Sequence, residues 1–312
     1  MSRRVLITGG AGYIGSVLAP ALLGTEFSVT VLDNFRYRQS SLFDCCYHDQ
    51  FQVITGDCRE RDTLRQALRQ ADIIIPLAAI VGAPACKRDR VAAISTNLEA
   101  IRLLLQLRSR DQRIFFPTTN SGYGIGEPGR FCTEETPLRP VSLYGTTKVD
   151  AEKAILDAGN AVSFRLATVF GMSPRMRLDL LVNDFVYRAV TDHTVVLFEA
   201  NAKRNYLHVR DVARAFLHAI RHYEQMKDQA YNVGLSEANL SKRELCAEIQ
   251  KQVHEFVYLE APVGEDEDKR DYIVSNAKIE KTGFKPLYSL EFGIRELIKG
   301  YRMLQRPEHA NV

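Results

Sequence analysis

A short glycine-rich segment near the amino terminus constrains the fold of this chain more than any other feature. Gly9, Gly12 and Gly15 recur at every third position, directly after an apolar run at 5–8 and directly before a helical pattern. Glycines in such a turn let the backbone bend sharply and approach a bound pyrophosphate, which then contacts the N–H groups that open the helix. The segment therefore predicts a strand, a phosphate-binding turn and a helix, which together start a dinucleotide-binding domain.

The rest of the first half repeats this order of elements. Short runs rich in β-branched residues alternate with helical patterns, as in a parallel sheet covered by helices. We therefore expect an α/β fold with a Rossmann-type, doubly wound parallel sheet. The predicted strands are 5–8, 28–32, 51–54, 72–76, 113–117 and 161–165, and the predicted helices are 13–23, 61–69, 90–108 and 144–158.

The order of elements changes after Gly171, which indicates a smaller mixed α/β lobe for binding substrate. We expect residues 1–170 to form the nucleotide-binding domain, with a return of the chain near 200–235, and residues 171–312 to form mainly the second lobe. The two parts are expected to interleave. The sequence predicts helices at 178–189, 211–222 and 290–304 and strands at 195–198 and 205–208 in this half. It also predicts a capping box that opens a helix at 241–244 and a solvated acidic loop at 265–268.

Charge and cysteine content exclude several classes of protein. With 41 basic and 38 acidic residues the net charge is +3, and no long block carries one sign, so no nucleic-acid surface is expected. No apolar run reaches the roughly 18 residues of a membrane span. The six cysteines show neither disulfide-framework density nor Cys-x-x-Cys spacing. We therefore expect no metal site and a reducing, cytoplasmic location.

Acidic residues follow the predicted strands that come after the glycine segment. Asp33 ends the second strand, where a carboxylate can accept hydrogen bonds from an adenosine ribose and would repel a 2′-phosphate; this favours NAD over NADP, although Arg36 and Arg38 lie nearby. Asp57 either accepts a hydrogen bond from an adenine amine or starts the next helix. The small residues at 77–79 either let the cofactor pass close to the backbone or let a helix pack closely. The further predicted cofactor contacts are Tyr13, Ile14, Asn34, Cys58, Leu77, Ala78, Ala79 and Asn97.

Tyr144 and Lys148 lie four residues apart in a predicted helix and therefore share one face, with their Cβ atoms about 5–6 Å apart. A phenol with a pKa of about 10 is a poor base at neutral pH. A neighbouring ammonium group favours the phenolate, which makes Tyr144 a candidate acid and base. The spacing is common by chance, so its meaning depends on the glycine segment and Asp33 in the same chain.

Taken together, these motifs resemble those of the extended short-chain dehydrogenase/reductases, and within them the NAD-dependent nucleotide-sugar epimerase/dehydratase group. The resemblance covers essentially the whole chain. It implies NAD as cofactor, a nucleotide-diphosphate sugar as substrate, and a homodimer formed through helices 90–108 and 144–158. The motifs that carry it, in the family's order, are the glycine segment, Asp33, Gly56-Asp57, Leu77-Ala78-Ala79, Thr118-Thr119, Tyr144-x-x-x-Lys148 and residues 204–212, which are similar to the family's R-D-Y-I-H-V-x-D-V segment.

The resemblance also implies roles for individual residues. Thr119 would hydrogen-bond the sugar C4 oxygen, Tyr144 would remove its proton, and Lys148 would bind the nicotinamide ribose and lower the pKa of Tyr144. Thr118 or Ser121 could take the place of Thr119. The family's late Arg-Pro-Gly-Asp motif is absent, which leaves the nucleotide base open. The expected substrate contacts are Thr119, Asn120, Ser121, Thr168, Arg177, Asn183, Arg204 and Arg270.

The residues after Thr119 separate the reactions of this group. Asn120 and Ser121 stand where the 4,6-dehydratases carry an Asp-Glu pair, and neither side chain is a general acid or base near neutral pH. We therefore expect oxidation at C4 by a nucleotide-sugar 4-epimerase. The alternative is net redox by a C4 dehydrogenase, for example of a GDP-heptose, or by a keto-sugar reductase. A non-catalytic NAD-binding regulator is disfavoured because the catalytic trio is retained, and Cys86 is either structural or an extra acid/base group.

Overall fold

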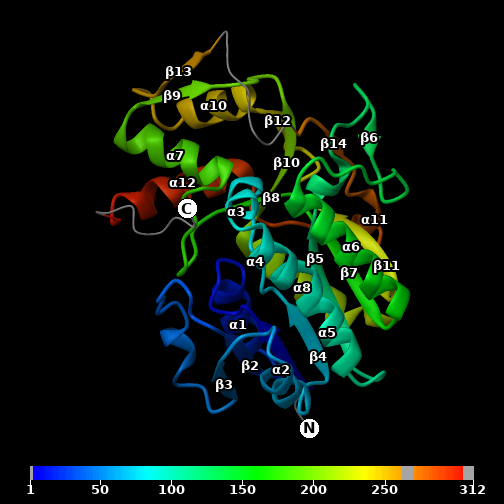
Figure 1. The fold of residues 1–312 in the computed structure, drawn as a ribbon. Coiled ribbons are helices and arrows are strands. Elements are labelled where there is room, and N and C mark those ends of the chain that lie inside the picture. Colours follow the sequence, from blue (N-terminus) through cyan, green and yellow to red (C-terminus); the bar gives the residue numbers. More distant parts are fainter. Residues whose placement is uncertain (1–2, 262–269, 305–312) are drawn as a thin grey trace.

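The computed structural model describes residues 3–261 and 270–304. Figure 1 shows a lower part built on a central sheet and a smaller upper part into which the chain passes in its second half. The acidic loop predicted at 265–268 lies outside the described residues. Where the two parts meet, the ends of several central strands point toward the upper part.

The central sheet has seven strands, all paired in parallel, in the order β11-β7-β5-β4-β1-β2-β3. The predicted doubly wound α/β sheet is therefore confirmed, and the carboxyl ends of its strands share one edge. One strand, β11, was not predicted. The strands are β1 (Arg3–Thr8), β2 (Phe27–Asp33), β3 (Phe51–Thr55), β4 (Ile73–Pro76), β5 (Arg113–Thr119), β7 (Ala161–Leu166) and β11 (Gln229–Val233).

Helices cover both faces of this sheet, and one predicted helix differs from expectation. The region predicted as a single helix at 90–108 is divided into α4 (Arg90–Ile94), a π-helical turn (Ser95–Glu99) and α5 (Ala100–Leu107). The wide turn carries Asn97, whose amide bonds the backbone N–H and C=O of Ile80 at 2.8 and 2.9 Å. The other helices of this part are α1 (Gly15–Leu23), α2 (Arg61–Leu68), α3 (Ala83–Arg88), α6 (Leu143–Ala158), α8 (Val209–Arg221) and α9 (Tyr223–Met226), with 3₁₀ turns at Phe43–Cys45 and Asn120–Tyr123.

Within its described residues, the second part contains three small sheets and four helices. The predicted capping box is confirmed, because Ser241 and Glu244 each bond the other's backbone N–H at the start of α10. The sheets pair β12 (Asn239–Ser241) with β10 (Lys203–His208) and β8 (Thr168–Phe170), β9 (Thr194–Leu197) with β13 (Val257–Glu260), and β6 (Phe131–Cys132) with β14 (Ile273–Val274). The helices are α7 (Leu181–Thr191), α10 (Lys242–Gln250), α11 (Ala277–Glu280) and α12 (Leu290–Tyr301).

The hydrophobic core reaches both faces of the central sheet. Along β4, Ile73 and Ile75 pack into one cluster and Ile74 into the other, as expected for a parallel strand buried on both faces. The cluster that contains Ile73 also contains Val182 of α7 and Ile294 of α12. The second part is therefore packed against the nucleotide-binding part through a continuous apolar core.

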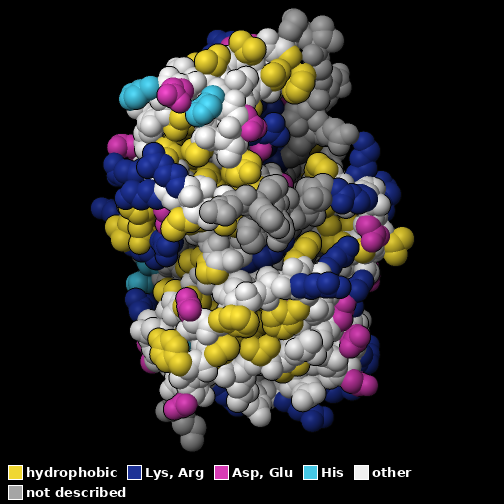
Figure 2. Space-filling model, turned by 90° about the vertical axis from the view of Figure 1, so that its left-hand side faces the viewer, with side chains coloured by type: hydrophobic (Ala, Val, Ile, Leu, Met, Phe, Trp, Pro, Cys, Tyr) yellow, Lys and Arg dark blue, Asp and Glu magenta, His cyan; other side chains and the backbone are white. Residues whose placement is uncertain are grey.

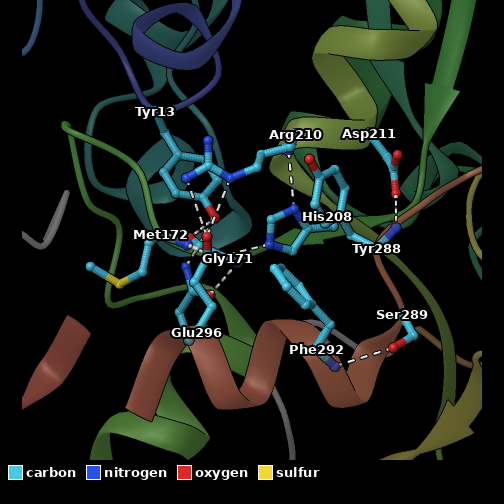
Figure 3. Close-up of polar contacts among 11 residues, drawn as sticks. Tyr13, Gly171, Met172, His208, Arg210, Asp211, Tyr288, Ser289, Phe292 and Glu296 are labelled. Atoms are coloured by element: carbon cyan, nitrogen blue, oxygen red, sulfur yellow. Dashed lines mark hydrogen bonds and ion pairs between the residues drawn. The ribbon is translucent and has the colours of Figure 1, made fainter. Parts of the chain in front are cut away.

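A buried histidine holds α12 to the start of the second part. His208 Nε2 lies 2.9 Å from a carboxylate oxygen of Glu296, and its Nδ1 accepts the N–H of Arg210 at 3.2 Å (Figure 3). Because Nδ1 is an acceptor, Nε2 carries the proton and donates it to Glu296. The same carboxylate accepts the backbone N–H of Met172 at 2.9 Å and pairs with the Arg210 guanidinium at 3.2 Å. Glu296 thereby fixes the chain just after Gly171.

The surface is mixed in character. On the face drawn in Figure 2, basic and acidic side chains are interspersed, and a group of hydrophobic side chains occupies the lower half. Two exposed hydrophobic side chains, Val91 and Ile94, lie in α4, and a third, Val141, lies just before α6. No helix in the described ranges is both long and apolar enough to cross a membrane.

Candidate active site

A cavity of about 480 Å³ opens at the carboxyl edge of the central sheet, between the glycine segment and the second part. Its size is typical of a site for a small organic ligand. The structure brings most of the predicted site residues to its wall. Those are Gly9, Gly12, Tyr13, Ile14, Gly15, Asp33, Asn34, Asp57, Cys58, Leu77, Ala78, Ala79, Thr119, Tyr144, Lys148, Thr168, Arg177, Arg204 and Arg270.

The glycine segment forms a part of this wall, called here the glycine cradle, in which Gly9 and Gly15 have no room for a Cβ atom. Gly9 has φ of +69°, and a Cβ atom there would stand 2.6 Å from the backbone of Ala78. A Cβ at Gly15 would stand 2.3 Å from the carbonyl oxygen of Gly10. The backbone of the first strand-to-helix turn is thus open to a ligand, and its N–H groups suit a pyrophosphate. The residues present fit a dinucleotide cofactor.

Two carboxylates stand where the sequence predicts contacts with the adenosine. Asp33 is fixed by the backbone N–H groups of Ala11 and Phe35, at 3.0 and 2.8 Å. Burial raises the pKa of Asp33, and these two hydrogen bonds oppose the rise. Asp57 pairs with Arg59 at 2.6 Å, which lowers the pKa of Asp57. Asp33 is therefore pre-oriented at the cavity wall, within a site where ribose hydroxyls could donate to it.

The candidate catalytic residues come from two neighbouring elements. Thr119 ends β5, and Tyr144 and Lys148 lie in the first turns of α6, which Ser142 caps by accepting the N–H of Gly145 at 3.1 Å. Lys148 is 4% exposed, and its Nζ lies 3.9 Å from the centre of the Phe116 ring. Burial lowers the pKa of Lys148 to about 7, against an opposing effect of the nearby Glu152 carboxylate.

The pKa of Tyr144 differs in direction from the expectation. Burial raises it to about 12, while the charges of Arg177 and Arg270 and a hydrogen bond with Thr119 lower it. The expected lowering by Lys148 does not prevail because Lys148 is itself buried and holds only part of its charge near neutral pH. The charges of Arg177 and Arg270 supply the electrostatic support for the phenolate.

Four of the predicted binding residues lie behind the cavity wall rather than in it: Asn97, Asn120, Ser121 and Asn183. Asn97 is occupied by the backbone of Ile80. Asn183 accepts the N–H of Gly171 at 3.0 Å and donates to the Tyr13 hydroxyl at 3.2 Å. Asn97 and Asn183 therefore support the wall of the site from behind. The amide of Asn120 is buried without a hydrogen-bond partner in the described structure.

Cys86 is fully buried in α3 and does not line the cavity. Its thiol donates to the carbonyl oxygen of Ile80 at 3.2 Å, and burial raises the pKa of the thiol to about 11. A thiol in this state is a poor acid/base group near neutral pH, so the structure favours the structural interpretation. Within residues 3–261 and 270–304, no group of three or more His, Cys, Asp or Glu side chains is placed to hold a metal ion.

Sequence reasoning missed the way the segment after Gly171 crosses to the glycine loop. The hydroxyl of Ser173 donates to the carbonyl oxygen of Tyr13 at 2.7 Å. The guanidinium of Arg175 lies 4.6 Å from the centre of the Tyr37 ring, and both residues line the cavity with Asp179. The cluster of basic residues directly after Gly171 was the only signal in the sequence. It could not reveal the contact with Tyr37, which depends on how the lobes pack.

The sheet, the glycine turn and the Tyr–Lys pair define an NAD-binding α/β protein of the dehydrogenase/reductase type. A model of the NAD dependent epimerase/dehydratase family matches residues 5–234. The chain therefore belongs to this family, and its cofactor is NAD.

Proteins that match nearly the whole chain include a decarboxylase and an epimerase. The Low-salt glycan biosynthesis protein Agl12 of Haloferax volcanii is 27% identical over 95% of this chain and 98% of its own. A UDP-N-acetyl-alpha-D-glucosaminuronate decarboxylase of Bacillus cytotoxicus is 28% identical over 98% and 99%. The structure of a UDP-glucose 4-epimerase of Thermus thermophilus with NAD has a TM-score of 0.82 and 25% identity over 96% of this chain and 99% of its own. These similarities establish the family but not the reaction.

Proposed function

We propose that this protein uses NAD to oxidise C4 of a nucleotide-diphosphate sugar and acts as a nucleotide-sugar 4-epimerase. The observation that carries the proposal is that Thr119, Tyr144 and Lys148 meet in the cavity that also contains the glycine cradle. A UDP-glucose 4-epimerase of Corynebacterium glutamicum, 28% identical over 79% of this chain and 80% of its own, supports it. So does the Thermus thermophilus enzyme described above.

The residues of the chain divide the chemistry among them. Bound NAD supplies a hydride acceptor that can also return the hydride. Thr119 hydrogen-bonds the C4 hydroxyl, and Tyr144 takes the hydroxyl proton at its phenolic oxygen and gives it back when the ketone is reduced. The Lys148 amine, protonated or neutral, has N–H donors beside Tyr144 that can bind ribose hydroxyls. Because Asn120 cannot act as an acid or base, no water is eliminated from the sugar.

The cavity also offers groups for the diphosphate of the substrate. Arg177 and Arg204 both line it, and their guanidinium groups are almost fully buried. Arg177 pairs with Asp179, which fixes the direction of its remaining donors. A planar guanidinium can bind two phosphate oxygens at once. We therefore propose Arg177 and Arg204 as diphosphate contacts.

A screen of UDP-, GDP-, dTDP-, CDP- and ADP-sugars tests the proposed function. The protein is incubated with NAD and each sugar, NADH absorbance is followed, and product stereochemistry is read by NMR. We expect one sugar to be converted to its C4 epimer without accumulation of NADH, since the hydride returns to the same molecule. Net NADH with a keto sugar would identify the alternative dehydrogenase, and elimination of water would contradict the role given to Asn120. The absence of any conversion would refute the proposed function.

We also propose that the protein acts as a homodimer in the cytoplasm. All six cysteines are free in the structure, which suits a reducing compartment. The exposed side chains of Val91 and Ile94 on α4 offer an apolar surface in one of the segments expected to pair.

A further inference from the structure

The hydroxyl of Thr119 belongs to a chain of hydrogen bonds that leads away from the cavity. It donates to Ser121 Oγ at 2.9 Å and accepts the backbone N–H of Ser121 at 3.1 Å. Arg270, which precedes β14 in the second half of the sequence, donates through Nη1 to the same Ser121 oxygen. Arg270, Ser121 and Thr119 are therefore connected in series, although Arg270 is 149 residues from Ser121.

Ser121 has no direct access to a ligand. Its side chain is 2% exposed and is not part of the cavity wall, whereas Thr119 and Arg270 are. A guanidinium has donors only, so the Ser121 oxygen must accept from Arg270. Removing either partner would break this bond and loosen the position of the Ser121 hydroxyl. Any effect of Ser121 on a bound sugar must therefore pass through Thr119 or Arg270.

The same chain reaches Tyr144. The charge of Arg270 favours the phenolate of Tyr144 against the effect of burial, and Thr119 is within hydrogen-bonding reach of the same phenol. Arg270 is thus close enough to the proposed base to act on it electrostatically. Lys148, which was expected to supply that charge, is largely desolvated and has a pKa of about 7.

We propose that Arg270 and Ser121 are positioning residues for the reaction at C4: Arg270 fixes the Ser121 oxygen, and Ser121 accepts the O–H of Thr119, which leaves the lone pairs of the Thr119 oxygen to accept from Tyr144 and from the reacting sugar hydroxyl. This inference rests on the proposed function and deepens it. It gives Arg270 a role at the reacting end of the site, whereas the sequence predicted only that Arg270 contacts the substrate. It also gives Ser121, which replaces the Glu of the dehydratase pair, a role without proton transfer.

Two variants test the inference, Arg270→Gln and Ser121→Ala. Misplacing the Thr119 hydroxyl should lower kcat roughly ten- to hundred-fold while KM changes less than about two-fold. Calorimetric titrations with UDP, GDP and dTDP should give wild-type affinities, and NAD should still bind, which shows that the site is folded. Ser121→Thr keeps the hydroxyl and should retain more activity than Ser121→Ala. Arg130→Gln, on an arginine whose side chain is 77% exposed, is the matched control.

A weaker nucleoside diphosphate affinity with unchanged kcat in Arg270→Gln would show that Arg270 binds phosphate and would overturn the inference. Unchanged kcat in both variants would overturn it as well. A measurement that needs no substrate distinguishes failure of this inference from failure of the proposed function. With 3-fluorotyrosine incorporated, whose phenol is more acidic, ¹⁹F NMR follows the Tyr144 titration, assigned by its loss in Tyr144→Phe. We expect a higher pKa in Arg270→Gln than in wild type, and equal values would refute the inference.

Discussion

At the residue scale, burial shifts the pKa values of Tyr144 and Lys148 in opposite directions. Both lie one helical turn apart at the wall of the cavity, where little water remains to stabilise a charge. Desolvation disfavours the phenolate, so it raises the pKa of Tyr144 to about 12. It disfavours the ammonium, so it lowers the pKa of Lys148 to about 7. Near neutral pH Tyr144 is therefore uncharged and Lys148 only partly charged, and Arg177 and Arg270 are the fixed charges beside the reaction.

Tyr144→Phe should abolish turnover while NAD still binds. The substitution keeps the ring and removes only the oxygen that takes the C4 proton, so we expect a loss of roughly 10²- to 10⁴-fold in kcat. Steady-state kinetics with the sugar identified by the screen, and NAD titration of the same preparation, measure both quantities. Tyr47→Phe, at a tyrosine that is 79% exposed, should behave as wild type. Unchanged turnover in Tyr144→Phe would contradict the assigned mechanism.

Lys148 should make stability depend on pH in a definite direction. Its folded pKa of about 7 lies below the ordinary value of 10.5, so between these values the unfolded chain binds more protons than the folded one. The free energy of unfolding therefore rises with pH across this window. Lys148→Met removes the cost of burying the charge. It should be more stable than wild type at pH 7, by up to about 4 kcal/mol, and the difference should close near pH 10.

Urea denaturation of the NAD-free proteins at several pH values between 7 and 10 measures this difference. Lys153→Met, at an exposed lysine of the same helix, controls for helix propensity and should show no such pH dependence. A stability difference that stays constant with pH would mean that Lys148 keeps an ordinary pKa in the folded protein.

At the element scale, one carboxylate on α12 makes several polar contacts with distant parts of the chain. Glu296 accepts from His208 and Met172 and pairs with Arg210, and it thereby joins α12 to the end of β10 and the segment after β8 (Figure 3). That segment runs past Gly171, whose carbonyl oxygen accepts the Tyr13 hydroxyl at 2.7 Å. The glycine turn is therefore connected to a helix near the far end of the chain.

Glu296→Ala should destabilise the protein by about 2–4 kcal/mol, because it leaves the buried N–H groups of His208 and Met172 without an acceptor. Glu291→Ala on the same helix removes a carboxylate whose side chain is 71% exposed and should cost less than about 0.5 kcal/mol. Urea denaturation of both variants gives the comparison. Equal effects would show that α12 is held by its apolar contacts alone.

The elements that the sequence predicted correctly are those with a strong local signal. The strands predicted at 5–8 and 72–76, the glycine turn and the capping box at 241–244 depend on neighbouring residues only. The errors occur where tertiary contacts override the local pattern. The helix at 90–108 is interrupted because Asn97 turns inward to bond Ile80. The strand β11 was missed because Gln229–Val233 is short and becomes a strand only by pairing with β7.

At the scale of the whole molecule, the open question is assembly. Val91 is 80% exposed on α4, and Val141 is 53% exposed before α6. We expect these positions to be covered in a homodimer, since the resemblance to the family implies pairing through this region. Sedimentation velocity at micromolar concentration should therefore give the mass of a dimer.

Val91→Asp should shift that equilibrium toward the monomer, because a carboxylate would be buried in the apolar contact. Val257→Asp places the same charge on the exposed valine of β13, away from the predicted interface, and should leave the dimer intact. A wild-type monomer, or equal dissociation of both variants, would refute the predicted interface.

The sequence by itself determined the α/β sheet and the glycine turn, because both depend on short spacings and on the order of elements. It also predicted Asp33 and the Tyr144–Lys148 pair, and the resemblance to the family added Thr119 to that pair. The tertiary structure alone decided which of the predicted residues reach the cavity and what charge they hold there. Asn97, Ser121 and Asn183 stand behind the wall, and Arg270 reaches Ser121 across 149 residues of sequence. Burial and contacts between distant residues set these properties, and neither is encoded in local spacing.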